Sequence, residues 1–176
     1  KTFSSRRYEI WCIRASGHNV PLVNGVEQKN GPQFRATNVE FRRQGPVQKL
    51  SMNIEKAYPP EAKLVSLKRE MAFDGGKDPS IVIHDTFRHS SRGGRIVVPV
   101  FTPCKISLSR GKVVLMGGRS PIYIRYEPDT MSVRTGTVKI DDPRLQKSWG
   151  NRLNFASFTF RTGTDRGEYR LAISGK

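Results

Sequence analysis

The chain has 176 residues, 36% of them hydrophobic, which is the length and composition of an ordinary globular domain and excludes an intrinsically disordered chain. Lys and Arg number 31 against 15 Asp and Glu, and a formal net charge of +16 favours polyanionic partners. No apolar run is long enough for a membrane-spanning helix. Cys12 and Cys104 are too few for a disulfide framework, and either pair once or stay as buried thiols.

Most of the chain shows the two-residue alternation and the β-branched and aromatic content typical of strands. The predicted strands are residues 7–14, 34–43, 80–87, 95–101, 105–109, 112–116, 121–126, 135–140, 154–162 and 168–174. A break in the alternation near Asn38 predicts a β-bulge. Turn signals such as Asn24-Gly25 and Arg110-Gly111 separate the segments. Short strands at this spacing predict an all-β fold, an antiparallel β-sandwich in a single domain over residues 1–176.

Residues 59–73 fit two structures equally well. Leu64, Leu67 and Met71 would form one stripe of an amphipathic helix that begins at Pro59-Pro60. Residues 64–73 also fit the alternation of a strand. Periodicity alone does not choose between the two.

Residues 17–28, GHNVPLVNGVEQ, contain the first of three histidines. His18 either fixes the end of a hairpin through bonds from its ring to the backbone, or ligates a metal, or contacts a substrate. Asn24-Gly25 is a strong signal for a two-residue hairpin turn, because both positions tolerate positive φ. Asn19 and Gln28 suit backbone or capping bonds as well as contacts with sugar hydroxyls.

The remaining polar candidates have structural interpretations. Asp85, within an apolar strand, is expected to be a buried anchor paired with an arginine. Asp141-Asp142-Pro143 is typical of a turn, with Trp149 packing the loop that follows. His84 and Asp85 are adjacent on a strand and so point to opposite faces, while His89 is expected in a turn. The sequence contains no spacing that prearranges a metal site, no nucleophile elbow and no phosphate-binding loop.

Five landmarks in order resemble the heparinase II/III-like family of bacterial polysaccharide lyases, over essentially the whole chain. They are TFSSRRYEIWCIRASGHNVPLVNGVEQ (2–28), the strand from Phe34 to Phe41, AYPPEAKLVSLKRE (57–70), IVIHDTF (81–87) and VKIDDPRLQKSWGNRL (138–153). The resemblance favours a strand over residues 64–73. It implies a β-sandwich that forms the C-terminal part of a larger lyase, and the start at Lys1 without a methionine fits this expectation.

The resemblance also implies what lies elsewhere. In the family an N-terminal α/α toroid precedes the β-sandwich, and Tyr and His residues outside this chain carry out β-elimination on a uronate. We therefore expect the fragment to be inactive alone. His18 corresponds to a histidine that is often a third ligand of a structural zinc or other divalent metal, which upstream residues would complete. The implied protein is bacterial and periplasmic or extracellular.

Two functions compete on the sequence alone. In the first, the chain supports a lyase active site and helps bind an acidic, uronate or sulfated polysaccharide through Arg14, His18, Asn19 and Gln28. In the second, it is a stand-alone basic domain that binds polyanions, including nucleic acid without sequence specificity. No ribonucleoprotein-type or helix-turn-helix motif supports the second, and we favour the lyase module.

Overall fold

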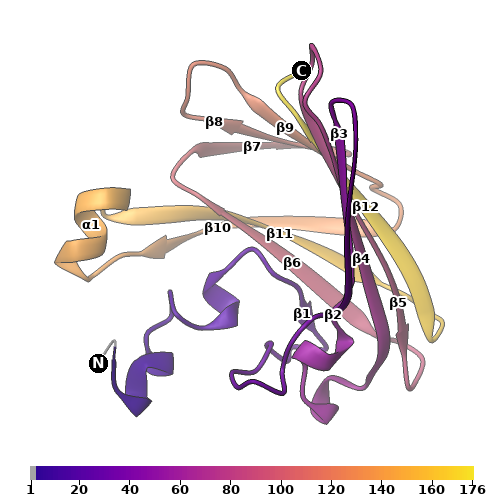
Figure 1. The fold of residues 1–176 in the computed structure, drawn as a ribbon. Coiled ribbons are helices and arrows are strands. Elements are labelled where there is room, and N and C mark those ends of the chain that lie inside the picture. The colour runs from indigo at the N-terminus through magenta and orange to yellow at the C-terminus, as the bar shows by residue number, and fades with distance from the viewer. Residues whose placement is uncertain (1–2) are drawn as a thin grey trace.

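The computed structural model describes residues 3–176 as two antiparallel sheets that enclose a shared core (Figure 1). The four-stranded sheet has the order β1-β6-β11-β10, and the eight-stranded sheet has the order β2-β3-β4-β5-β12-β9-β8-β7. The predicted all-β antiparallel sandwich is thereby confirmed. No helix among the described residues is long and apolar enough to cross a membrane.

The strands are short to medium in length and most successive strands are joined by connections of five residues or fewer. Their bounds are β1 Leu22–Val23, β2 Thr37–Gln44, β3 Val47–Asn53, β4 Leu64–Asp74, β5 Ser80–His89, β6 Arg95–Thr102, β7 Lys105–Ser109, β8 Lys112–Met116, β9 Ile122–Tyr126, β10 Met131–Lys139, β11 Arg152–Arg161 and β12 Arg166–Ser174. The helices are the α-helix α1 (Pro143–Trp149) and 3-10 helices at Ser5–Glu9, Ala15–Gly17, Glu55–Ala57 and Pro60–Ala62. The predicted bulge near Asn38 is present as a register shift between Thr37 and Glu40.

The strand predicted over residues 7–14 is wrong. The N–H groups of Ile10 and Ile13 bond to carbonyls three residues earlier, those of Arg7 and Ile10, at 3.1 and 2.9 Å. These local bonds build 3-10 helix and turns instead of a sheet. Trp11 packs on Phe101 of β6, with ring centroids 5.9 Å apart, so the apolar residues of this segment cover a sheet without joining it.

Other differences concern elements that alternation marks poorly. β3 was not predicted, whereas the ambiguous residues 59–73 form a 3-10 turn followed by β4, which confirms the strand. The predicted turn at Asp141-Asp142-Pro143 instead starts α1. Asp142 caps this helix by accepting a hydrogen bond from the Arg144 N–H at 2.8 Å, and Pro143 occupies its first turn.

The core lies between the two sheets and is rich in aromatic residues. Phe87 of β5 meets Phe160 of β11 edge to face at 5.3 Å, and Tyr126 meets Phe158 in the same way at 5.5 Å. Such contacts between the sheets add to the stability gained from apolar burial. Cys12 and Cys104 are both free and half-buried, so they do not pair.

A charged cluster lies within this core on three adjacent strands. Arg69 of β4 forms two hydrogen bonds with Asp85 of β5, at 2.8 and 2.6 Å, and the hydroxyl of Tyr169 of β12 donates to the same carboxylate. Asp85 is fully buried and Arg69 is 8% exposed. Burial alone would lower the pKa of Arg69, but the Asp85 carboxylate outweighs this and raises it. The prediction that Asp85 is a buried anchor paired with an arginine is confirmed.

His89 is the last residue of β5 and lies in the interior, which corrects its expected place in a turn. Its Nδ1 lies 3.4 Å from the Asn24 side-chain amide nitrogen, while its Nε2 is buried without a hydrogen-bond partner among residues 3–176. Gly94 packs against the ring so closely that an added Cβ would lie 1.9 Å from Cδ2. Burial lowers the pKa of His89, since the charged imidazolium would be poorly solvated there.

Asp85→Asn is expected to destabilise the fold by about 3–5 kcal/mol, because it leaves the buried Arg69 guanidinium without its counter-charge. The urea midpoint of unfolding measures the loss. Asp129→Asn is the matched control, because Asp129 pairs with Arg110 on the exposed surface and an exposed pair contributes at most about 1 kcal/mol. Equal losses for the two variants would contradict the assignment.

The free energy of unfolding is expected to fall as the pH drops below about 6.5, the ordinary pKa of histidine, because the unfolded chain then binds a proton that buried His89 does not. The slope from this one group is at most about 1.4 kcal/mol per pH unit. His89→Phe should flatten the profile between pH 7 and 5, whereas His18→Gln should keep it. An unchanged slope in His89→Phe would refute the prediction.

Candidate functional site

A surface depression of about 660 Å³ brings together residues from the N-terminal segment and from the β1 turn. Its walls come from residues 8–20 and 25–30, with Pro59 at one side. Figure 1 shows this N-terminal segment, in indigo, running beside the four-stranded sheet. Arg14, His18 and Gln28, three of the four residues predicted to contact a glycan, line the depression.

The type of turn predicted at Asn24-Gly25 positions one wall of the depression. Asn24 and Gly25 have φ of 53° and 80°, and Val23 and Val26 exchange backbone hydrogen bonds of 3.1 and 2.8 Å across them. This is the two-residue hairpin that the sequence indicates. The Asn24 side chain also ties the turn to the core by donating to the Ala62 carbonyl at 2.8 Å.

Arg14 also lines the depression and is neutralised by Glu27. Its guanidinium contacts the Glu27 carboxylate at 2.5 and 3.5 Å, and the Ser16 N–H donates to the same carboxylate at 3.1 Å. Partial burial would raise the pKa of Glu27, but the bonds from Arg14 and Ser16 prevail and lower it. Arg14 can therefore bind a ligand through its remaining N–H donors, but it contributes little uncompensated charge.

His18 follows the 3-10 turn Ala15–Gly17, and its N–H donates to the Ala15 carbonyl at 3.1 Å. The side chain is exposed, and within residues 3–176 its ring makes no hydrogen bond. The hypothesis that the ring fixes the hairpin through backbone bonds is therefore not supported, since the Asn24 side chain does this instead. A ring with both nitrogens accessible is suited to contact a ligand.

Asn19 and Gln28 have structural partners. The Asn19 side-chain oxygen accepts from the Phe101 N–H at 2.8 Å, which fastens the N-terminal segment to β6 outside the depression. The Gln28 amide donates to the Tyr58 hydroxyl at 3.3 Å, and that hydroxyl donates to the Pro21 carbonyl at 2.6 Å. Burial raises the pKa of Tyr58 to about 12, so this tyrosine stays protonated. Glycan contact by Asn19 and Gln28 stays a prediction.

Sequence reasoning did not single out several other lining residues, among them Lys29 and Tyr8. Lys29 is exposed beside Gln28, and its ammonium lies 5.5 Å from the centre of the Phe34 ring. Because Lys29 directly follows the predicted Gln28 in the sequence, it could have been identified from its position. Tyr8 also lines the depression, but its assignment to a strand hid this, because only the 3-10 helix Ser5–Glu9 places it there.

The described residues do not form a metal site. Residues 3–176 contain no group of three or more His, Cys, Asp or Glu side chains arranged to hold an ion. Among the described residues that line the depression, His18 is the single imidazole, and the nearby Glu27 is already bonded to Arg14 and Ser16. This donor set does not fit zinc, which takes three or four protein ligands. A metal completed by residues outside this chain stays a prediction.

Comparison with solved structures finds the same fold within larger polysaccharide lyases. Three similar structures are a heparan sulfate lyase, HepC from Pedobacter heparinus (TM-score 0.65, 12% identity), a heparinase III gene product (0.66, 17%) and a heparinase III (0.61, 13%). The matches cover 90, 93 and 97% of this chain but only 24, 24 and 25% of the other chains. No protein-family model matches the sequence, and no curated protein matches it significantly in sequence.

The chain thus has the fold of a β-sandwich sub-domain. More particularly, it resembles the part of heparinase III and heparan sulfate lyase that makes up about a quarter of their length. This confirms, at the level of fold, the family resemblance that the five sequence landmarks carry. The TM-scores establish the shared fold, whereas identities of 12 to 17% are too low to carry function over, so function is argued from the site itself.

Glu27→Gln is expected to cost about 0.5–1 kcal/mol of stability, because it removes the counter-charge of Arg14 and weakens the bond to the Ser16 N–H. Urea unfolding at neutral pH measures it. Glu40→Gln is the control, since Glu40 pairs with Arg42 where both side chains are largely exposed. A loss no greater than that of the control would show that Glu27 does not hold the wall of the depression.

Proposed function

We propose that this chain is a β-sandwich module of a heparinase III-type polysaccharide lyase, and that the depression around Arg14, His18 and Lys29 contacts an acidic glycan. The observation that supports this most directly is the gathering of two predicted residues, Arg14 and His18, with Lys29 in one hollow. The fold, shared with a quarter of the length of heparan sulfate lyase and heparinase III, supports the parent class.

The lining offers the donors that a uronate or sulfated sugar needs. The Arg14 guanidinium and the Lys29 ammonium suit carboxylate and sulfate groups, and the exposed His18 ring can donate to either. Glu27 and Asn30 supply oxygen acceptors for sugar hydroxyls. Because Glu27 neutralises Arg14, Lys29 carries the uncompensated charge and Arg14 gives directional hydrogen bonds.

The chemical step is assigned to residues outside this chain. β-Elimination requires neutralisation of the uronate carboxylate, a base for the C5 proton and an acid for the leaving oxygen. In the depression the imidazole of His18 has no hydrogen-bonded partner among the described residues to orient it as a base. The module is therefore proposed to bind and support the glycan without cleaving it.

The purified chain is expected to bind heparin, alginate or polygalacturonate selectively at moderate salt, with no rise in the absorbance of unsaturated uronate. The double variant Arg14→Ala/Lys29→Ala should bind the preferred glycan about fivefold or more weakly, since two charge-assisted contacts are lost. Lys77→Ala/Arg134→Ala is the matched control, because it removes one Lys and one Arg from exposed positions outside the depression.

Three results would contradict the proposal. If the control variant lost as much glycan affinity as Arg14→Ala/Lys29→Ala, net charge alone would drive binding. Equal binding to every glycan and to duplex DNA, lost steeply with salt, would favour a non-specific polyanion-binding domain. A rise in absorbance would show that a catalytic centre lies within these 176 residues.

A further inference from the structure

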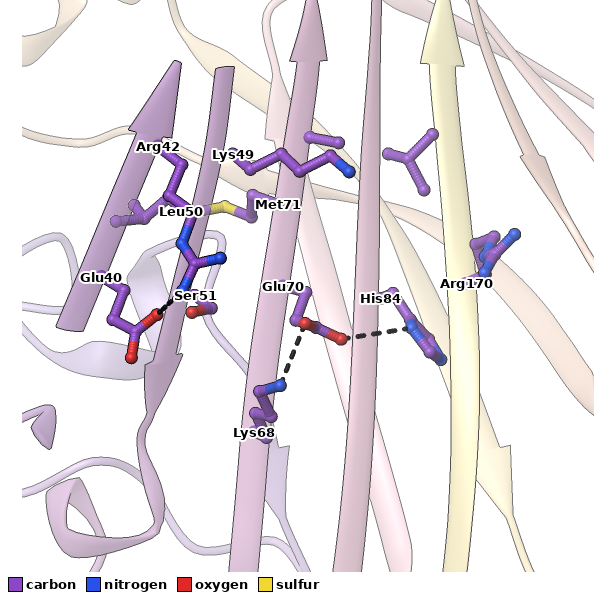
Figure 2. A pocket seen from close by; sticks show the side chains of 12 residues that line it. Glu40, Arg42, Lys49, Leu50, Ser51, Lys68, Glu70, Met71, His84 and Arg170 are labelled. Carbon is purple, nitrogen blue, oxygen red and sulfur yellow. Dashed lines mark hydrogen bonds and ion pairs between the residues drawn. The ribbon is translucent and has the colours of Figure 1, made fainter. Parts of the chain in front are cut away.

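A second depression, of about 550 Å³, lies on the outer face of the eight-stranded sheet and spans five of its strands, β2, β3, β4, β5 and β12 (Figure 2). Among the described residues, it shares no lining residue with the depression at the N-terminal segment. One row of aligned residues crosses it from strand to strand: Glu40, Ser51, Glu70, His84 and Arg170. A second row runs alongside it through Arg42, Lys49, Ala72 and Val82.

The acidic side chains of this face already have partners. Glu70 binds Lys68 at 3.0 Å and lies 3.9 Å from the His84 ring, and Figure 2 shows it between the two. The hydrogen bond from Lys68, together with Lys49 and His84 nearby, lowers the pKa of Glu70. Glu40 binds Arg42 at 3.1 Å, and both are largely exposed. Both carboxylates therefore already have cationic partners within the face.

Two cations on opposite sides of the depression are not neutralised. Among residues 3–176, neither Lys49 on β3 nor Arg170 on β12 forms an ion pair, and in Figure 2 no dashed line joins either of them to another side chain drawn there. Three strand spacings separate their strands, which corresponds to about 14 Å at about 4.8 Å each. A ligand that spans this separation and carries anionic groups on more than one unit is suited to contact both.

Part of the surface between these cations is formed by short, apolar side chains. Ala72 of β4 is aligned with Lys49 on one side and with Val82 of β5 on the other. These short side chains stand among Arg, Lys and Glu side chains, so a flat ligand can approach the sheet there while the longer side chains reach around it.

The lining selects among anionic ligands. Glu70, Glu40 and the Ser51 hydroxyl are acceptors for hydroxyl groups, and carboxylates next to the cations oppose a continuous row of phosphates. The described lining residues include no Phe, Tyr or Trp ring on which a nucleic-acid base would stack. A ligand that alternates anionic groups with hydroxyls, as acidic oligosaccharides do, satisfies both sets of groups.

We propose that this face is a second, non-catalytic site for an acidic oligosaccharide, held between Lys49 and Arg170 over the Ala72–Val82 floor. The proposal takes its ligand class from the proposed function but depends on a different face of the sandwich. Its role is to hold a chain segment that extends away from the first depression, so that one glycan or two segments engage the module at two places.

The test uses four variants, one of them Arg14→Ala/Lys29→Ala, and a size-defined heparin or alginate oligosaccharide at moderate salt, with binding followed by calorimetry. Lys49→Ala/Arg170→Ala should lower the affinity of this site about tenfold, because two charge-assisted contacts are lost. Lys77→Ala/Arg134→Ala removes the same charge elsewhere and should change it less than twofold. Ala72→Leu leaves the charge unchanged but fills the floor, and should weaken binding as much as the double variant.

Each outcome separates this site from the first. Weaker oligosaccharide binding by Lys49→Ala/Arg170→Ala and by Ala72→Leu supports the second site. This holds even if Arg14→Ala/Lys29→Ala binds normally, a result that would exclude the first depression. If only Arg14→Ala/Lys29→Ala binds the oligosaccharide more weakly, the proposed function is supported and the second site is overturned. A result for Lys49→Ala/Arg170→Ala equal to the control, an unaffected Ala72→Leu, or a wild-type chain that binds no acidic glycan also overturns it.

Discussion

The buried cluster of Arg69, Asp85 and Tyr169 determines the arrangement of the eight-stranded sheet. The three residues are direct register partners on β4, β5 and β12, so the ion pair and the tyrosine bond form in a single strand alignment. A slip of one residue would turn Asp85 to solvent and leave Arg69 buried without its counter-charge. Apolar packing tolerates small shifts of one strand along another, whereas this cluster does not. The cluster therefore specifies the register.

The same register builds the outer face. Glu70, His84 and Arg170 are the sequence neighbours of Arg69, Asp85 and Tyr169, and side chains of successive residues in a strand point to opposite faces. The alignment that buries the ion pair thus also places the outer row across one depression. One strand register therefore determines both the buried ion pair and the arrangement of the outer face. A shift in register would disrupt both.

The sequence predicted those parts of the fold whose cause is local. Alternation and turn residues located most strands, and Asn24-Gly25 predicted its hairpin. Residues 7–14 also alternate, yet no neighbouring strand is paired with them, and Trp11 finds its apolar contact on Phe101 instead. Pairing depends on distant segments, which a single sequence does not show. Arg14 and His18 were found for the first depression, but Tyr8 was hidden by the mistaken strand.

The net charge of +16 does not by itself say where a polyanion would bind. Arg14 and Arg69 are both bonded to carboxylates, one at the surface and one in the core, so their charge is largely cancelled where they lie. Lys49 and Arg170 have no such partner among the described residues, although they stand beside neutralised carboxylates. What distinguishes a binding face on this basic protein is therefore local compensation: a ligand gains most where cations lack internal partners and hydroxyl acceptors lie within reach.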